Sequence, residues 1–344
     1  MLGAGAAAAG QLGLGYGLGI IAWMPAVSGD ETTAAWTSSL AWTTFIGATS
    51  VVIGAVVGDR SGWAGRSGRV QRAAWCMVLS LAASLGALVT IPLVAVPASQ
   101  AKVVDTFAPH LLAGIYAASG VVIGLVVSVV ALAARAVAIN FLVTTAWLWI
   151  LAIVAVAGWI AAGHIDHADL GVWKFTNTGP EIGPFYLPGV LILLGGALLI
   201  GGLAAFARAM RGDGRLGVAI SGAAGPIIVT AAYVLANPAA DRTPFEAVSA
   251  ARTAPIMIVA GLVGSVLVAA VGGVRRPKRS AKKKGDAAPP APDRPAPSTP
   301  DRPSTSDRRS TPAPDRAAPR ATATASVPAA YRLDPGQYPP PPRS

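Results

Sequence analysis

The sequence predicts an all-α protein, a polytopic membrane helix bundle of about eight transmembrane helices followed by a disordered C-terminal tail. Three observations predict this fold class. The chain is 53% hydrophobic and only 12% charged over 344 residues, which is too apolar and too weakly charged for a soluble globular domain. Its apolar residues fall in runs long enough to cross a bilayer. The composition changes abruptly at Arg275.

The apolar runs define the predicted helices. A spanning helix needs about 20 mostly apolar residues. Eight runs reach this length, at residues 3–27, 36–57, 73–96, 110–134, 141–162, 187–207, 216–236 and 254–274. The runs are continuous instead of alternating between apolar and polar residues, so each is predicted to satisfy its backbone as a helix and not as a barrel strand. Residues 1–274 are therefore predicted to form one transmembrane helical bundle.

Charge placement predicts the orientation of these helices. Alternate connections are basic and carry Arg60, Arg66, Arg69, Arg72, Arg135, Arg208, Arg211 and Arg215. The other connections are net acidic, with Asp30, Glu31, Asp105, Asp166, Asp169, Glu181, Asp241 and Glu246 against Lys102, Lys174, Arg242 and Arg252. The positive-inside rule places the basic connections and, for an even number of spans, both termini in the cytoplasm. Heavy use of Ala, Gly, Arg and Pro indicates a GC-rich bacterial genome, and hence a bacterial plasma membrane.

The first apolar run raises a question about the start of the chain. It begins at residue 3 with no basic residue ahead of it, which predicts a natural start upstream. A cleaved signal peptide is the rival interpretation, because "AVS" before Gly29 suits a peptidase. The missing basic segment and the length of the glycine-rich run favour an anchor helix.

Residues 275–344 form the predicted tail. They hold 17 of the 28 prolines and +9 of the +11 net charge, from 15 basic minus 6 acidic residues. Such a segment cannot bury a core and is predicted to be disordered. The basic cluster between Arg275 and Lys284 adjoins the last apolar run and lacks interleaved aromatic residues. It therefore predicts binding to anionic lipid headgroups and not to nucleic acid, while the rest of the tail is predicted to bind an unknown cytoplasmic protein.

The stretch "GHIDHADLG" at residues 163–171 is the candidate metal site. His164 and His167 lie three residues apart, on one face if the fifth helix continues, and Asp166 lies beside them. This spacing is usable for a divalent cation. The alternative is that polar residues collect where a helix leaves the bilayer. Two histidines supply only two good ligands, so we expect no saturable binding tighter than millimolar.

Few polar side chains lie inside the runs. Away from the run ends there is no Asp, Glu, Lys, Arg or His, which argues against a proton-coupled transporter or an intramembrane hydrolase. The stretch "SGAAGPII", which starts at Ser221, places glycine and Pro226 inside the seventh run and predicts an opened helix around a solute. Glycines four residues apart, at Gly13 and Gly17 and at Gly120 and Gly124, predict close helix packing.

These observations predict a non-enzymatic multi-pass membrane protein, without a cofactor, that recruits or regulates a partner through its tail. The alternative is a small-solute or cation permease built around the broken seventh helix.

Overall fold

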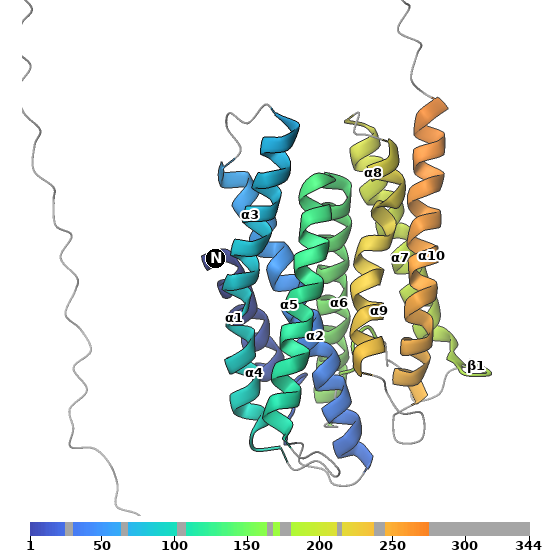
Figure 1. Cartoon of the computed structure of the whole chain (residues 1–344). Coiled ribbons are helices and arrows are strands. Elements are labelled where there is room, and N and C mark those ends of the chain that lie inside the picture. The colour runs from blue at the N-terminus through green and yellow to red at the C-terminus, as the bar shows by residue number, and fades with distance from the viewer. Residues whose placement is uncertain are drawn as a thin grey trace, which may run out of the picture. The chain divides into compact units, whose positions relative to one another are not determined.

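The computed structural model describes residues 1–24, 30–62, 68–101, 108–163, 168–172, 180–211, 215–236 and 245–274. These residues form a bundle of roughly parallel and antiparallel helices (Figure 1). The predicted tail, with its basic cluster from Arg275 to Lys284, lies outside the described residues.

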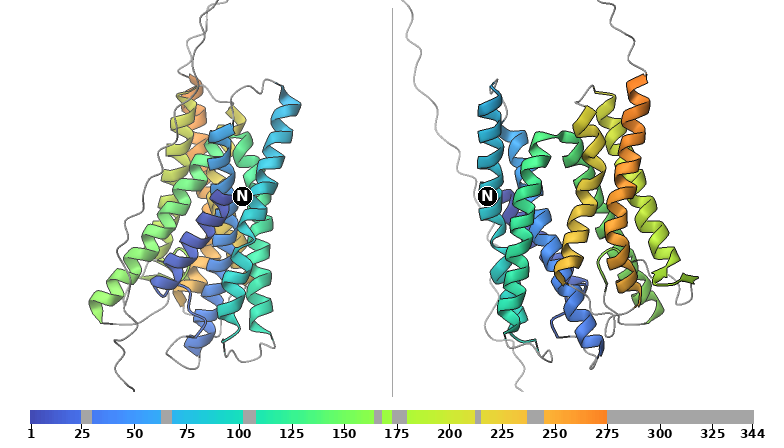
Figure 2. Two further views of the ribbon diagram at one scale, coloured as in Figure 1. Left: turned by 90° about the vertical axis from the view of Figure 1, so that its left-hand side faces the viewer. Right: turned by 45° about the vertical axis from the view of Figure 1, so that its right-hand side comes forward.

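The elements follow one another up and down the bundle (Figures 1 and 2). The helices are α1 (Leu2–Gly17), α2 (Asp30–Gly62), α3 (Arg69–Ala87), α4 (Thr90–Ala98), α5 (Pro109–Ala133), α6 (Arg135–Ala162), α7 (Leu187–Ala209), α8 (Arg215–Ile220), η1 (Ser221–Ala223), α9 (Ala224–Ala236) and α10 (Phe245–Val274). A two-stranded antiparallel hairpin, β1 (Glu181–Ile182) and β2 (Phe185–Tyr186), precedes α7. Among the described residues, seven helical segments are long and apolar enough to cross a membrane.

The first predicted span differs from the structure. It was expected over residues 3–27, but α1 ends at Gly17 after 16 residues. That length is about 24 Å, against the roughly 30 Å hydrocarbon core of a bilayer. The glycine-rich sequence explains the early end, because glycine is a poor helix former and Gly19 adopts a positive φ of 69° that stops the helix. An eighth full-length span is therefore not confirmed.

Two of the seven segments are interrupted, each one turn before a proline. The segment Val70–Ala98 has a turn at Leu88 and Val89, ahead of Pro92. The segment Leu216–Ala236 changes to a 3₁₀ turn at Ser221–Ala223, ahead of Pro226. Proline has no N–H to donate to the carbonyl four residues earlier, so the α-helical ladder is lost at that point. The interruption predicted in the seventh run is confirmed.

Glycine at the α2–α5 contact brings two backbones together. A Cβ on Gly120 would lie 2.3 Å from the Thr44 carbonyl oxygen, and one on Gly124 would lie 2.6 Å from that of Ala48. The predicted close packing at Gly120 and Gly124 is therefore confirmed. Gly13 has the same four-residue spacing, but no atom lies within 4 Å of its Cβ position.

Several polar groups inside the bundle join neighbouring helices. Gln11 of α1 accepts hydrogen bonds at Oε1 from Thr49 Oγ1 and Trp149 Nε1, each at 3.0 Å, and donates from Nε2 to Ser50 Oγ at 3.0 Å. One amide thus connects α1, α2 and α6. This arrangement fits the general expectation that polar groups in apolar helices bond their neighbours.

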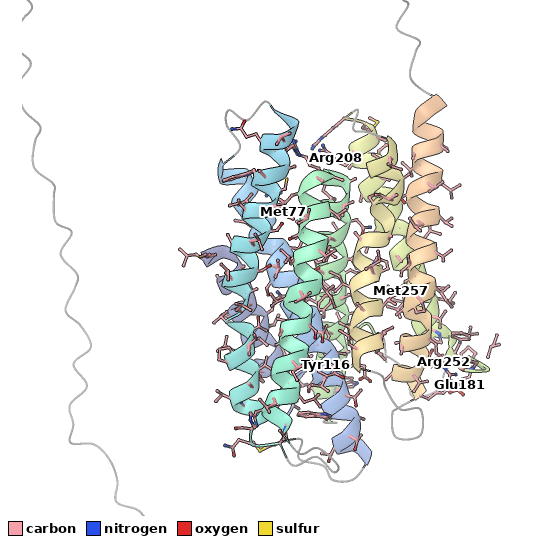
Figure 3. All side chains as sticks on the ribbon, in the orientation of Figure 1. Met77, Tyr116, Glu181, Arg208, Arg252 and Met257 are labelled. Carbon is pink, nitrogen blue, oxygen red and sulfur yellow. The ribbon has the colours of Figure 1, made fainter. Side chains whose placement is uncertain are left out.

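One end of the bundle carries arginines, and we call it the arginine end. Arg60 and Arg208 lie in the last turns of α2 and α7, and Arg135 begins α6. Arg72, near the start of α3, donates to the carbonyl of Leu132 near the end of α5 at 3.2 Å. Figure 3 shows Arg208 near this end, whereas Glu181 and Arg252 lie near the opposite end. The alternation predicted from the sequence is thus present in space for the described residues.

Candidate functional site

The interrupted segment α8–η1–α9 is the strongest candidate site. Its residues Ser221 to Pro226 are all buried. The 3₁₀ turn leaves backbone groups without their usual helical partners, and groups from two other helices take their place. The site therefore places backbone N–H and C=O groups in a buried, apolar setting, where side chains of other helices bind them.

Ser265 of α10 and Asn140 of α6 hold the interruption together. The N–H of Gly222 donates to Ser265 Oγ at 3.3 Å, and the N–H of Gly225 donates to Asn140 Oδ1 at 3.0 Å. Ser265 Oγ in turn donates to the carbonyl of Ala219. Gly225 lies in the first turn of α9, so Asn140 caps that helix from a neighbouring one. Both side chains fix the broken backbone in one conformation.

The face of α6 that meets the interruption carries polar atoms that lack partners among the described residues. These atoms are Asn140 Nδ2, Thr144 Oγ1 and Trp147 Nε1. The residues are four and three positions apart, so they share one side of the helix. Because the Asn140 oxygen must face the Gly225 N–H, its NH₂ group points elsewhere and a flip of the amide would not satisfy it.

Thr144 and Trp147 contact glycines on the helices opposite. A Cβ on Gly225 would lie 2.3 Å from Thr144 Oγ1, and one on Gly196 of α7 would lie 2.7 Å from Trp147 Nε1. The two glycines thus let polar side-chain atoms approach backbone directly. The arrangement gives a row of donors along α6 that begins at the N-terminus of α9.

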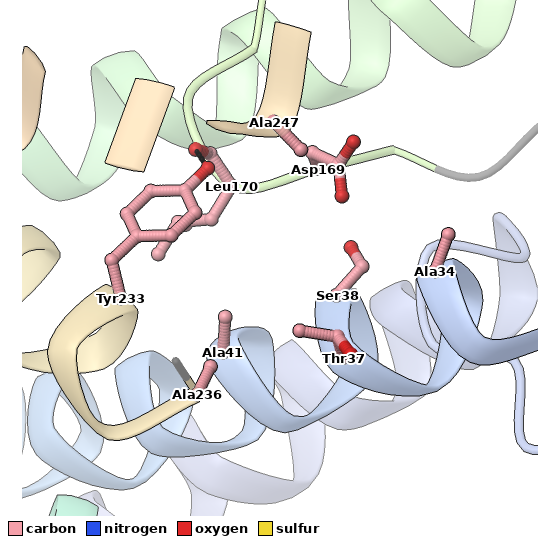
Figure 4. A pocket seen from close by; sticks show the side chains of 9 residues that line it. All are labelled: Ala34, Thr37, Ser38, Ala41, Asp169, Leu170, Tyr233, Ala236 and Ala247. Carbon is pink, nitrogen blue, oxygen red and sulfur yellow. Dashed lines mark hydrogen bonds between the residues drawn. The ribbon is translucent and has the colours of Figure 1, made fainter. Parts of the chain in front are cut away.

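A second, smaller feature is a pocket near the opposite end of the bundle (Figure 4). It lies between α2, the segment 168–172, α9 and α10, and its polar lining comes from Thr37, Ser38, Asp169 and Tyr233. Its free volume is about 10 Å³, which is the space of about one water molecule. This pocket can hold a water molecule or a small ion, and nothing larger without rearrangement.

The segment 168–172 is fixed over the bundle by hydrogen bonds to its carbonyls. Trp42 Nε1 and Ser38 Oγ donate to the Ala168 oxygen at 2.6 Å and 3.1 Å. The Tyr233 hydroxyl donates to the Leu170 oxygen, as Figure 4 shows. Leu170 is completely buried. These contacts anchor a connecting segment, and they do not form a nucleophile with an adjacent base.

The predicted metal ligands His164, His167 and Asp166 lie outside the described residues. Their neighbour Asp169 is described, and it lines the pocket of Figure 4. His110 is exposed in the first turn of α5. Within the described ranges, no three His, Cys, Asp or Glu residues gather as metal ligands. The metal site remains a prediction from the sequence.

Sequence reasoning did not select Asn140 or Ser265. The fifth apolar run begins at residue 141, whereas α6 begins at Arg135. Asn140 therefore lies just outside the predicted span. Counting the helix from Arg135 includes Asn140, the one uncharged polar side chain in the first two turns of α6. The stretch that starts at Ser221 was predicted from the sequence, and the structure places Thr144 of α6 against Gly225 in this stretch.

Comparisons with protein-family models, with curated proteins and with solved structures found no match to this chain.

Proposed function

We propose that this chain is a non-enzymatic, multi-pass protein of a bacterial plasma membrane that recruits or regulates a cytoplasmic partner through its basic, proline-rich tail. Both termini face the cytoplasm in this proposal, which requires α1 to act as the eighth crossing element. The bundle anchors the tail and positions it at the membrane surface.

The observation that carries the proposal is the division of charge. Of the net charge of +11, +9 falls in residues 275–344, and α10 ends at Val274, directly before that segment. Among the described residues, seven apolar helical segments are suited to a membrane anchor by length and composition. Each basic residue near an anionic leaflet contributes about 1 kcal/mol of attraction, so the cluster from Arg275 to Lys284 favours the cytoplasmic surface.

The orientation predicts which surface residues react with an impermeant thiol reagent. In a Cys76→Ala background, we expect Glu181→Cys to be labelled from outside intact cells, because Glu181 is exposed at the end opposite the arginines. We expect Gly68→Cys, exposed at the arginine end, to be labelled only after permeabilisation. The reverse pattern would show that the arginine end faces outward.

Removal of the tail is expected to separate anchoring from recruitment. Deletion of residues 286–344 should leave membrane insertion and the melting temperature unchanged, since a segment of this composition buries no core. It should abolish capture of the partner by the purified protein. A truncated chain that melts earlier than the full chain would show that the tail stabilises the bundle, contrary to this proposal.

A second candidate function is favoured by one specific observation. The interruption at Ser221–Ala223, with Asn140 and Ser265 bound to its backbone, resembles the discontinuous helices that line solute sites in transporters. A small-solute permease is therefore the alternative, and uptake into vesicles containing the purified protein tests it.

A further inference from the structure

We infer that the interruption between η1 and α9 binds a small inorganic anion, which the side chains of Asn140 and Thr144 hold beside the first turn of α9. This inference deepens the permease candidate by naming a class of ligand. It concerns binding, and it holds whether or not the bundle transports the ion.

The first support is the pair of buried donors at one point. Asn140 and Thr144 are 1% and 3% exposed, and both contact Gly225 in the first turn of α9. Within the described part of the chain, Asn140 Nδ2 and Thr144 Oγ1 have no hydrogen-bond partner. Leaving such a group unpaired in an apolar interior costs about 1–3 kcal/mol, so a ligand that accepts from both is favoured.

The second support is the direction of the helix. α9 has 13 residues and begins at Ala224, so its positive dipole end lies beside Asn140 and Thr144. The dipole of a helix favours an anion at its N-terminus. In α9 the first N–H groups are already bound, since that of Ala224 donates to the Ser221 carbonyl and that of Gly225 to Asn140 Oδ1. Pro226 removes one N–H from this turn, and the side-chain donors of α6 supply others in its place.

The third support is the charge of the surroundings. The helices α6, α7 and α9 contain no acidic residue. Arg135 lies five residues before Asn140 on α6, which is about 7.5 Å along the helix axis. The site is therefore near the arginine end, where positive charge raises the local concentration of anions.

The donors also discriminate between ligand classes. Asn140 Nδ2 and the more distant Trp147 Nε1 only donate, so a cation finds no ligand at either atom. A polycarboxylate is too large for a site where Thr144 lies directly on Gly225. A monovalent inorganic anion, for which chloride is the simplest probe, fits a few neutral donors at a helix N-terminus.

The test compares the melting temperature of the purified full chain in sodium chloride and in sodium gluconate at equal ionic strength. A ligand bound only by the folded state stabilises it in proportion to ln(1 + [L]/Kd). At ten times its dissociation constant, chloride should raise the melting temperature by about 3 °C relative to gluconate. Equal melting temperatures at all concentrations would overturn the inference.

Thr144→Val is the decisive variant, because it removes a hydroxyl that has no partner among the described residues and keeps the shape of the side chain. We expect it to fold as well as the parent in gluconate and to lose the chloride-dependent shift. Thr145→Val is the matched control, since the Thr145 hydroxyl donates to the Phe141 carbonyl of its own helix at 2.9 Å. It should keep the shift. A shift of equal size in both variants would place the effect elsewhere and refute the site.

Asn140→Asp provides a second variant that does not depend on Thr144. Its carboxylate keeps an acceptor for the Gly225 N–H and itself places a negative charge at the N-terminus of α9. The variant should therefore no longer respond to chloride, whereas an unchanged response would contradict the inference.

Chloride flux in vesicles separates binding from transport. Flux that Thr144→Val abolishes supports both the site and the permease. A chloride-dependent shift without flux keeps the site and rejects the permease. If Thr144→Val changes neither the chloride flux nor the chloride-dependent shift in melting temperature, the site is rejected and the permease is kept.

Discussion

Replacement of Gly261 by alanine is expected to destabilise the bundle by about 3 kcal/mol, at the upper end of the usual cost of overpacking. A Cβ on Gly261 of α10 would lie 2.1 Å from the carbonyl oxygen of Gly222 in η1. In the opposite direction, a Cβ on Gly222 would lie 1.8 Å from the carbonyl oxygen of Gly261. No rotamer relieves either contact, because both partners are backbone atoms. The helices must therefore separate.

The separation also affects the candidate site. Ser265 lies one turn from Gly261 on α10 and accepts the hydrogen bond of the Gly222 N–H. Moving α10 away from η1 breaks this bond and leaves a buried N–H unpaired, which adds to the cost. The expected measurement is a lowered melting temperature of the purified protein, with loss of any chloride-dependent shift.

Gly195→Ala is the matched control. Gly195 lies inside α7, and no atom is within 4 Å of its Cβ position. Alanine is favoured over glycine in a helix interior by about 1 kcal/mol, so this variant should be slightly more stable than the parent. If Gly261→Ala and Gly195→Ala had the same effect, the close contact between α10 and η1 would not determine stability.

The spacing of glycines in the sequence does not by itself predict which glycines lie in close helix contacts. Spacing of four residues correctly predicted close packing at Gly120 and Gly124, yet the same spacing at Gly13 leads to open space. The pattern fixes which residues share a helix face, but the partner of that face depends on contacts distant in sequence. The helix that packs against a given face therefore cannot be predicted from glycine spacing alone.

The apolar runs and the interruption were predictable because their causes are local. A run of about 20 apolar residues favours a helix by its own composition, and Pro226 removes one backbone donor from the helix that contains it. The early end of α1 had a local cause as well, in its glycines, but hydropathy alone favoured a longer helix. Glycine has no polar side chain that would end an apolar run, but it lowers helix stability.

The candidate site was only half predictable. The stretch from Ser221 to Ile228 was chosen for its glycine and proline content, which is a local signal. Its partner Asn140 is 85 residues away in sequence from Gly225. The hydropathy boundary at residue 141 hid Asn140, and no periodicity indicates which helix it faces. Unpaired donors are visible only once the helices are placed side by side.

Replacement of Trp42 by alanine is the second change with a large expected effect. Trp42 of α2 is fully buried. Its ring lies 5.6 Å from that of Phe45 in a T-shaped contact and 5.0 Å from that of Trp149. Truncating a buried tryptophan costs about 3–5 kcal/mol, because the lost contacts leave a cavity. The expected result is a large fall in melting temperature.

The same change should release the segment 168–172, because it removes both the ring that shares a buried cluster with Ala168 and Leu170 and the hydrogen bond from Trp42 Nε1 to the Ala168 carbonyl at 2.6 Å. In a Cys76→Ala background, Ala168→Cys is expected to resist a thiol reagent while Trp42 is present and to react when Trp42 is alanine. Trp42→Phe is the control: it keeps an aromatic ring in the core and removes one hydrogen bond, worth about 1 kcal/mol. Because the phenyl ring keeps most of the packing, and Ser38 and Tyr233 still hold the Ala168 and Leu170 carbonyls, the cysteine should stay protected in this variant. Equal reactivity of Ala168→Cys in all three backgrounds would show that the tryptophan does not fix the segment.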